Sequence, residues 1–207
     1  TEYKLKTLNR ALEMLGSCNR MLIRANDEKQ LLNDICTIAT DIGGYKMAWV
    51  GFAGPGDDKP IIPVAEWGDD SGFTNSIKLS YSETSTSGNG PGSRTIRTGK
   101  PVICEDIRNE DVRFHWKEEA LERGFRSIVC LPLKDGESCF GFISLLSENV
   151  NAISADELRL LKELADNVAF GVSALRTNIK QRTMQDTIVK VAQTVSNSAG
   201  KQFYQLL

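Results

Sequence analysis

Apolar residues recur with two different periods along this chain, and the change of period separates helices from strands. In residues 3–25 the leucines lie on one helical stripe, formed by Leu5, Leu8, Leu12, Leu15 and Leu22. Steps of three and four residues place side chains on one face of a helix, and their regular alternation is typical of coiled coils. The stripe predicts a helix packed on its own domain, or a parallel dimer seam in which Asn19 fixes the register.

A second helix is predicted directly after the first. Asp27 is a suitable N-cap because its carboxylate can accept a hydrogen bond from an amide of the first turn. Gly43 and Gly44 are suitable as its stop. Its apolar face is formed by Leu31, Leu32, Ile35, Ile38, Ala39 and Ile42.

From Tyr45 the period changes to two, which indicates strands. Strand segments are predicted at residues 45–52, 61–67, 76–79 (weakly), 101–104, 125–133 and 138–147. Short helices are predicted at residues 93–98 and 114–123. Asp135-Gly136 is suited to a tight hairpin turn. Helices at both ends and strands between them predict an α+β sandwich, in which an antiparallel sheet carries the terminal helices on one face.

Residues 154–196 predict one long helix. It opens with Ser154-Ala-Asp-Glu157, a capping box in which the Ser hydroxyl and the Glu carboxylate satisfy free amides. At 1.5 Å per residue such a helix would span about 65 Å, which is longer than one small domain needs. A polar patch at residues 177–183 interrupts the apolar stripe, and it predicts two packed helices joined through a hinge.

Composition narrows the classes of partner. The 207 residues include 25 Lys and Arg against 27 Asp and Glu, for a net charge of −2, and no basic run is present. Nucleic acid is therefore not expected as a partner. No apolar stretch reaches 18 residues, so no membrane contact by this segment is expected. Five scattered Cys without a C-x-x-C pair predict reduced core residues of a cytoplasmic protein rather than disulfides or a metal site.

Three segments together carry a resemblance to a known family: residues 90–102, 124–133 and 140–146. In this order and spacing they resemble GAF domains of bacterial sensory proteins that also carry histidine kinase, diguanylate cyclase or phosphodiesterase modules. The likeness covers roughly residues 8–176. It implies a PAS-like fold with a six-stranded antiparallel sheet, terminal helices on one face, and loops and short helices over a small-molecule pocket on the other.

The sequence gives little support for a catalytic function. His115 is the only His and stands beside no nucleophile motif. No Cys-His dipeptide occurs, which argues against the bilin-binding GAF photoreceptors. Cys104 is the nearest candidate for the thiol chemistry of GAF-type free methionine sulfoxide reductases, but it has no obvious resolving partner. Asp156-Glu157 is explained by helix capping rather than by a cyclic-nucleotide motif.

The Gly-rich loop at residues 88–92 precedes a short helix, so its amides predict either an anion cradle or a tight turn over the sheet. Aromatic residues from segments that the resemblance places at the pocket rim suit a small, partly apolar ligand, and two arginines nearby could meet a carboxylate. Core packing and a solvated face remain the alternatives. The candidate ligand-binding residues are Trp67, Gly90, Gly92, Arg94, Ile96, Arg97, Phe114, His115 and Trp116.

The sequence therefore predicts a non-enzymatic, small-molecule-sensing GAF domain without cofactor or metal. Residues 1–27 would form a linker and dimerisation helix, residues 28–176 the GAF domain, and residues 177–207 a signalling helix that begins a possible second, truncated GAF domain. The expected partners are an unknown small molecule, a second copy bound through the terminal helices, and an output domain on the same chain. The alternatives are a ligand-free dimerising spacer and, third, the sulfoxide reductase.

Overall fold

The computed structural model describes residues 2–68, 72–109 and 114–204. The helices are α1 (Glu2–Arg24), α2 (Glu28–Asp41), α3 (Phe73–Ser76), α4 (Pro91–Thr98), α5 (Lys117–Glu122) and α6 (Ala155–Tyr204), with 3₁₀ turns η1 (Thr86–Asn89) and η2 (Ile107–Asn109). The strands are β1 (Met47–Ala53), β2 (Ile61–Gly68), β3 (Val102–Cys104), β4 (Ser127–Asp135) and β5 (Ser138–Ser147).

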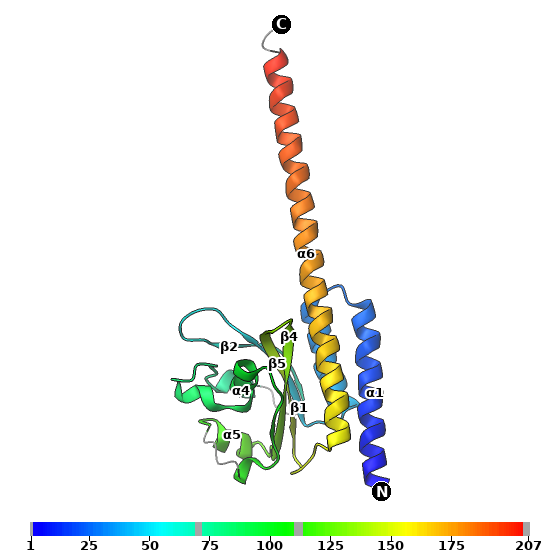
Figure 1. Ribbon diagram of the computed structural model, residues 1–207, viewed down its shortest axis with the longest axis vertical. Coiled ribbons are helices and arrows are strands. Elements are labelled where there is room, and N and C mark those ends of the chain that lie inside the picture. The colour runs from blue at the N-terminus through cyan, green and yellow to red at the C-terminus, as the bar shows by residue number, and fades with distance from the viewer. Residues whose placement is uncertain (1, 69–71, 110–113, 205–207) are drawn as a thin grey trace.

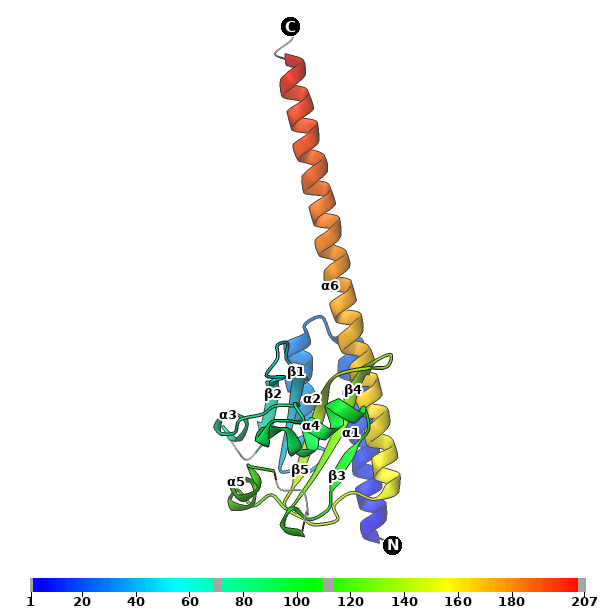
Figure 2. The ribbon, with the colours of Figure 1, turned by 60° about the vertical axis from the view of Figure 1, so that its left-hand side comes forward.

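These strands form one antiparallel sheet in the order β2-β1-β5-β4-β3. The helices α2 and α6 pack on one face of it, with α1 against both of them, and the small helices α3, α4 and α5 lie on the other face (Figures 1 and 2). The predicted α+β class, with helices from both chain ends on one face, is confirmed.

The prediction of a sixth strand is wrong, since the sheet has five strands within the described residues. Residues 76–79 begin at the end of α3, and the chain after them makes one isolated bridge, between Pro60 and Ser80. The backbone amide of Ile61 points away from the sheet's other strands and donates to the carbonyl oxygen of Leu79 at 3.1 Å. By strand alternation the next outward amide of β2 belongs to Pro63, which has no N–H to donate. A further strand along this edge would therefore lack one hydrogen bond at Pro63.

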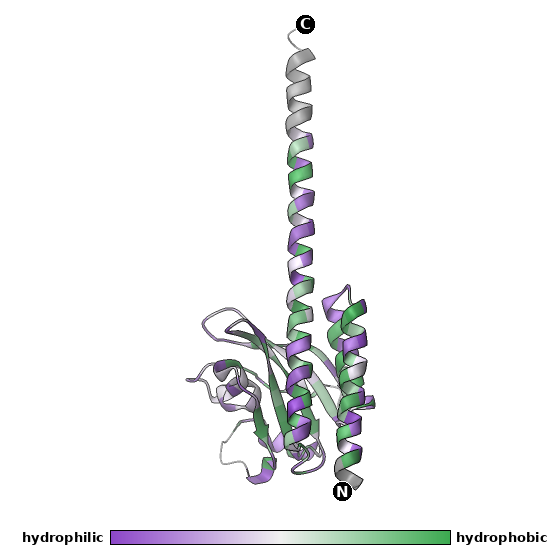
Figure 3. Cartoon of the chain, turned by 45° about the vertical axis from the view of Figure 1, so that its right-hand side comes forward, coloured by the Kyte–Doolittle hydropathy of each residue, from purple (hydrophilic) through white to green (hydrophobic). Residues whose placement is uncertain are grey.

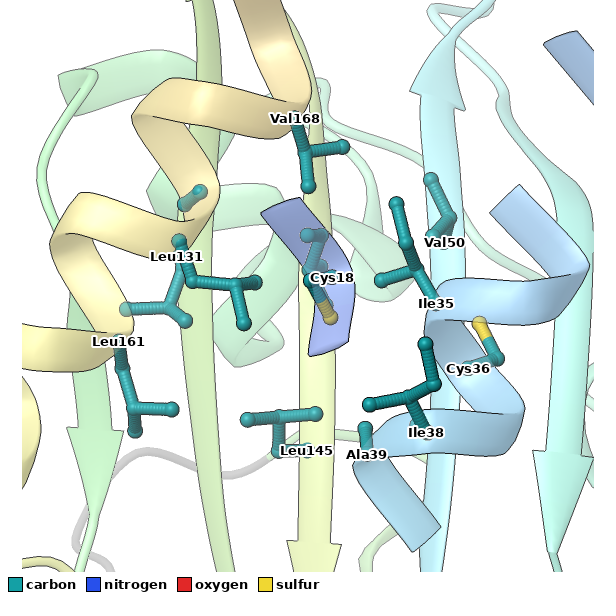
Figure 4. Close-up of a cluster of buried hydrophobic side chains, with 14 of the residues drawn as sticks. Cys18, Ile35, Cys36, Ile38, Ala39, Val50, Leu131, Leu145, Leu161 and Val168 are labelled. Carbon is teal, nitrogen blue, oxygen red and sulfur yellow. The ribbon is translucent and has the colours of Figure 1, made fainter. Parts of the chain in front are cut away.

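Alternation along the strands sorts the apolar residues into two clusters, one on each face of the sheet. On β1, Ala48 and Val50 belong to the cluster under the long helices, whereas Met47 and Trp49 belong to the cluster on the opposite face. All four are at least 97 % buried. Figure 4 shows part of the helix-side cluster, where Leu131 and Leu145 of the sheet face Leu161 and Val168 of α6 and residues of α2. Strands buried on both faces explain why β1, β4 and β5 are continuously apolar.

Caps fix where the helices begin. The Asp27 carboxylate accepts from the Gln30 amide at 2.7 Å, as predicted for α2. At the start of α6 half of the predicted capping box forms, because the Ser154 hydroxyl accepts from the Glu157 amide at 3.2 Å. The other half is wrong. The Glu157 carboxylate is buried and accepts from the Tyr45 hydroxyl at 2.7 Å, because the start of α6 packs on the sheet beside Tyr45.

Helix α6 is one unbroken helix of 50 residues. Its first part lies beside α1 against the sheet, and the remainder extends well beyond the globular part (Figures 1 and 2). The expected hinge is not a break in the helix. Residues 177–183 contain no Gly or Pro, and Lys180, Gln181 and Arg182 in this stretch favour helix.

None of the described helices contains a run that is both apolar and long enough to cross a membrane. The projecting part of α6 mixes apolar and polar positions around its circumference (Figure 3).

Candidate functional site

The face of the sheet opposite the long helices holds a small, enclosed space, which we call the aromatic hollow. It is lined by Trp49, Ile61, Leu79, Gly90, Gly92, Ser93, Trp116, Cys130, Phe142 and Ser144. Its volume is about 10 Å³. Pockets that hold small molecules measure roughly 300–1,000 Å³, so the hollow is closed in this conformation.

Aromatic rings close the hollow from the sheet side. Trp49 of β1 and Phe142 of β5 pack edge to face with ring centroids 4.9 Å apart. A β-carbon on Gly92 of α4 would collide with the Phe142 ring. Gly92 therefore lets α4 approach the sheet closely, which is the structural interpretation of the Gly-rich loop.

Trp116 closes the hollow from the other side. Its ring contacts Phe114, with centroids 4.3 Å apart, and Phe73, at 5.6 Å. The residue is 94 % buried, yet its indole Nε1–H has no hydrogen-bond partner. A buried N–H left unpaired costs about 1–3 kcal/mol. Trp116 therefore offers one unsatisfied donor among apolar rings.

The structure brings together some of the predicted site residues. Gly90, Gly92 and Trp116 line the hollow, and Ile96 and Phe114 are buried in the same cluster. Their binding of a ligand stays a prediction.

The two arginines of α4 have different environments. The Arg97 guanidinium donates to the carbonyl oxygens of Tyr81, at 3.2 Å, and Gly88, at 2.5 Å, and lies 3.7 Å from the Glu83 carboxylate. It therefore holds the loop before α4 in place. Arg94 is half-buried on the same helix.

Trp67 and His115 lie outside the hollow. Trp67 pairs with Ala48 across β1 and β2, so alternation turns its side chain toward the helix-covered side, and it is 53 % exposed at the sheet edge. His115 is exposed in the turn before α5. Residues 110–113, which precede this turn, lie outside the described residues.

Sequence reasoning missed Trp49 and Phe142, which supply the sheet side of the hollow. Both stand in the apolar runs that predicted strands. The missing information was which of the two alternating sets faces the short helices, because β1 and β5 are apolar on both faces.

Cysteine chemistry in the hollow is limited by burial and spacing. All five cysteines lie in described parts of the chain, and none forms a disulfide. Burial raises the pKa of the Cys130 thiol to about 12, so it is protonated near neutral pH. Cys130 pairs with Val102 and Cys104 with Ile128. Cys104 and Cys130 are therefore diagonal neighbours on adjacent strands. Residues in that relation stand about 7–8 Å apart, whereas a disulfide needs Cβ atoms about 4 Å apart.

No group of three or more His, Cys, Asp or Glu within residues 2–68, 72–109 and 114–204 is arranged to hold a metal ion.

Comparison with solved structures shows the same fold in several proteins. A free methionine-R-sulfoxide reductase from Neisseria meningitidis aligns with a TM-score of 0.67 at 15 % identity, over 81 % of this chain and 91 % of that one. The GAF domain of a phosphoenolpyruvate-protein phosphotransferase from Coxiella burnetii aligns with 0.66 at 14 % identity, over 83 % and 97 %. A domain described as part of a two-component sensor histidine kinase of Sinorhizobium meliloti aligns with 0.60 at 12 % identity, over 76 % and 99 %.

A comparison with curated proteins finds no significant match. The family model of the GAF domain matches residues 25–173, from the turn before α2 to the part of α6 that packs on the sheet. This match spans most of the chain and all five strands. The chain therefore belongs to the GAF domain family.

Proposed function

We propose that this GAF domain is a non-catalytic signalling module of the cytoplasm. It senses a small molecule at the aromatic hollow and relays occupancy through α6 to an output module of histidine kinase, diguanylate cyclase or phosphodiesterase type. The observation that carries the proposal is α6 itself, because one helix begins in the core of the domain and continues far outside it. A helix of this kind transmits movement at the sheet to whatever follows.

A chain of contacts supports a route from the hollow to α6. Phe142 lines the hollow on one face of β5. Phe140 packs with the helix-side cluster on the other face, because a register shift between β4 and β5 leaves Phe140 without a pairing partner and interrupts the alternation. The Arg176 guanidinium of α6 lies 5.0 Å from the Phe140 ring and 4.7 Å from the Phe52 ring. A shift of β5 that opens the hollow would therefore change the contact at the point where α6 leaves the domain.

Ligand entry requires the cover of the hollow to move, since about 10 Å³ admits no metabolite. The cover is α4 with the loop before it and the segment around Trp116. A ligand stabilises the open arrangement only in so far as it binds that arrangement better than the closed one. The unpaired Nε1–H of Trp116 supports a ligand that presents one hydrogen-bond acceptor beside an apolar body.

A ligand-free dimerising spacer is the second candidate. The observation that favours it is the closed hollow, whose rings already fill the space that a ligand would take. In that case α1 and α6 would hold two copies together, and the small helices would serve only to complete the core.

The free methionine sulfoxide reductase is the third candidate. Solved reductases share the fold at 8–16 % identity, for example that of Staphylococcus aureus at 8 %, which is a likeness of fold alone. Reductase chemistry with a thiol nucleophile needs a thiolate. The high pKa of Cys130 and its diagonal position relative to Cys104 argue against that chemistry here.

Tryptophan fluorescence with a metabolite panel separates these candidates. In a Trp67→Phe background the remaining two tryptophans, Trp49 and Trp116, both line the hollow and report on it. The sensor predicts that at least one metabolite shifts the emission and changes hydrogen exchange in both α4 and α6. The matched control is Gly90→Val, which places methyl groups against the Trp116 ring and should abolish the response. A panel that changes neither signal would leave the spacer, and turnover of methionine sulfoxide would establish the reductase.

A further inference from the structure

Helix α6 has two apolar faces, and only one of them is covered by its own domain. Val168 and Val172 are fully buried against the sheet and the neighbouring helices. Phe170 lies between them in sequence, on the opposite side of the helix, and is 78 % exposed. A large ring left in water on the surface of a folded domain marks an interaction site when it belongs to a wider apolar patch.

Further exposed apolar residues follow Phe170 at the same spacing along α6. We define the α6 seam as the positions reached from Phe170 by alternating steps of three and four residues. It consists of Asn167, Phe170, Ala174, Thr177, Gln181, Met184, Ile188 and Val191. The large apolar members beyond the domain, Met184, Ile188 and Val191, are 57–68 % exposed. Alternating steps of three and four are the spacing of a coiled-coil contact line.

At its domain end the seam enters a groove between α1 and α6. The groove has a volume of about 550 Å³, and Ile23 of α1, 85 % exposed, lines it together with Phe170. The Asn167 side-chain amide donates to the Asn19 side chain at 3.0 Å and ties the two helices together beside the groove. The groove and the seam thus form one surface that runs from the domain onto the free part of α6.

We propose that this surface binds a second copy of the chain, with the two α6 helices parallel and in register along the α6 seam. The inference deepens the proposed function, on which it rests for the role of α6 as the outgoing connector. A parallel two-fold axis sets every seam residue against its own equivalent. Phe170, Ile188 and Val191 then meet apolar partners.

The polar seam positions fit the same arrangement. Thr177 and Gln181 are consecutive seam residues, and in register they form two polar layers just outside the domain. A shift by one heptad, or an antiparallel partner, would set polar layers against apolar ones. These layers therefore select the register, at some cost in stability.

Charge supports a partner identical to the chain. Only two of the residues that flank the seam are charged, Asp166 and Lys180, and their charges are opposite. The flanking positions are Asp166, Gly171, Ser173, Asn178, Lys180, Gln185, Thr187 and Ala192. Arg182, Asp186 and Lys190 fall on the outer part of the helix. Two parallel copies therefore meet without rows of like charge, which at flanking positions disfavour pairing.

Sedimentation equilibrium of the full chain tests the α6 seam with a matched pair of substitutions. Ile188 and Val189 are adjacent, β-branched and 61 % and 53 % exposed, but only Ile188 belongs to the seam. Ile188→Lys should raise the dimer dissociation constant by about tenfold or more, whereas Val189→Lys should change it little. Both positions lie outside the domain, and circular dichroism checks that the fold is retained.

Cross-linking tests the direction of the two helices. Under mild oxidation Ile188→Cys should form a disulfide-linked dimer, and Val189→Cys should form much less. A chain that stays monomeric at high concentration, or that responds equally to both lysine substitutions, would overturn the proposal. A dimer in which Ile188→Cys does not cross-link would overturn the parallel register. None of these results depends on ligand, so they are distinguishable from failure of the sensing function, which the fluorescence of the hollow reports.

Discussion

The carboxylate of Glu28 accepts two hydrogen bonds from the guanidinium of Arg176, at 2.8 Å from Nε and 2.6 Å from Nη2. The residues are 148 positions apart and join the first turn of α2 to α6 where α6 leaves the domain. The same guanidinium lies over the rings of Phe52 and Phe140. One side chain thus connects α6 to α2 and to two strands.

Replacing Arg176 by Gln should therefore loosen the exit of α6. We expect a loss of about 1–3 kcal/mol in the free energy of unfolding, because a bidentate charge-assisted pair and the stacking on two rings are both removed. Faster hydrogen exchange should appear in α6 around residues 172–180. Arg182→Gln, on the exposed part of the same helix, is the control and should change neither quantity. Equal effects of the two substitutions would contradict a special role for Arg176.

The Tyr45 hydroxyl and the buried Glu157 carboxylate give a second prediction. Glu157 Oε1 accepts from Tyr45, and Oε2 has no partner. Tyr45→Phe removes the donor and should lower the free energy of unfolding by about 1–3 kcal/mol in urea denaturation near pH 7. Glu163→Gln, an exposed change on α6, serves as the control.

The same pair predicts a pH dependence. Burial raises the pKa of Glu157 above its ordinary value of 4.5, so the folded chain holds this proton more tightly than the unfolded chain. The stabilisation from Glu157 is therefore fully present below pH 4.5 and is lost as the pH rises through the folded-state pKa. Glu157→Gln should flatten this part of the stability profile. An unchanged slope in the Gln variant would show that other groups cause the dependence.

Features that depend on local sequence could be predicted, whereas features that depend on contacts between distant residues could not. The strands follow from alternation, and the cap at Asp27 follows from local chemistry. The side to which Trp67 points was not predictable, because a shift of one residue exchanges the two faces of a strand. The partner of Glu157 was not predictable either, since Tyr45 is 112 residues away and a local amide offers the same carboxylate an equally good bond. Within the hollow, the glycines of α4 carried a sequence signal, whereas Trp49 and Phe142 were hidden among other apolar strand residues.

Two helical glycines provide a matched test of close packing at the hollow. Gly92→Ala should destabilise the domain by about 1–3 kcal/mol, because its β-carbon would collide with the Phe142 ring. Gly16→Ala in α1 meets only the end of the Arg20 side chain, at 3.6 Å. It should stabilise the helix by about 0.5–1 kcal/mol, since alanine favours helix over glycine. Thermal denaturation should thus move in opposite directions for the two variants, and a neutral Gly92→Ala would mean that α4 can lift from the sheet at little cost.

The accessibility of the thiols gives a last prediction, which bears on the reductase alternative. Burial raises the pKa of Cys18 and of Cys130 to about 12, and both side chains are at least 98 % buried, so neither forms an appreciable amount of thiolate near pH 8. Cys139 is only half-buried, although burial raises its pKa as well. With a thiol reagent at pH 8, mass spectrometry of the native protein should show slow labelling at Cys139 and labelling of Cys18 and Cys130 only after unfolding. Cys139→Ser should therefore leave almost no labelling in the native state. Rapid labelling of Cys130 in the folded chain would show that the hollow opens readily to water, and it would restore a thiol-based reaction to consideration.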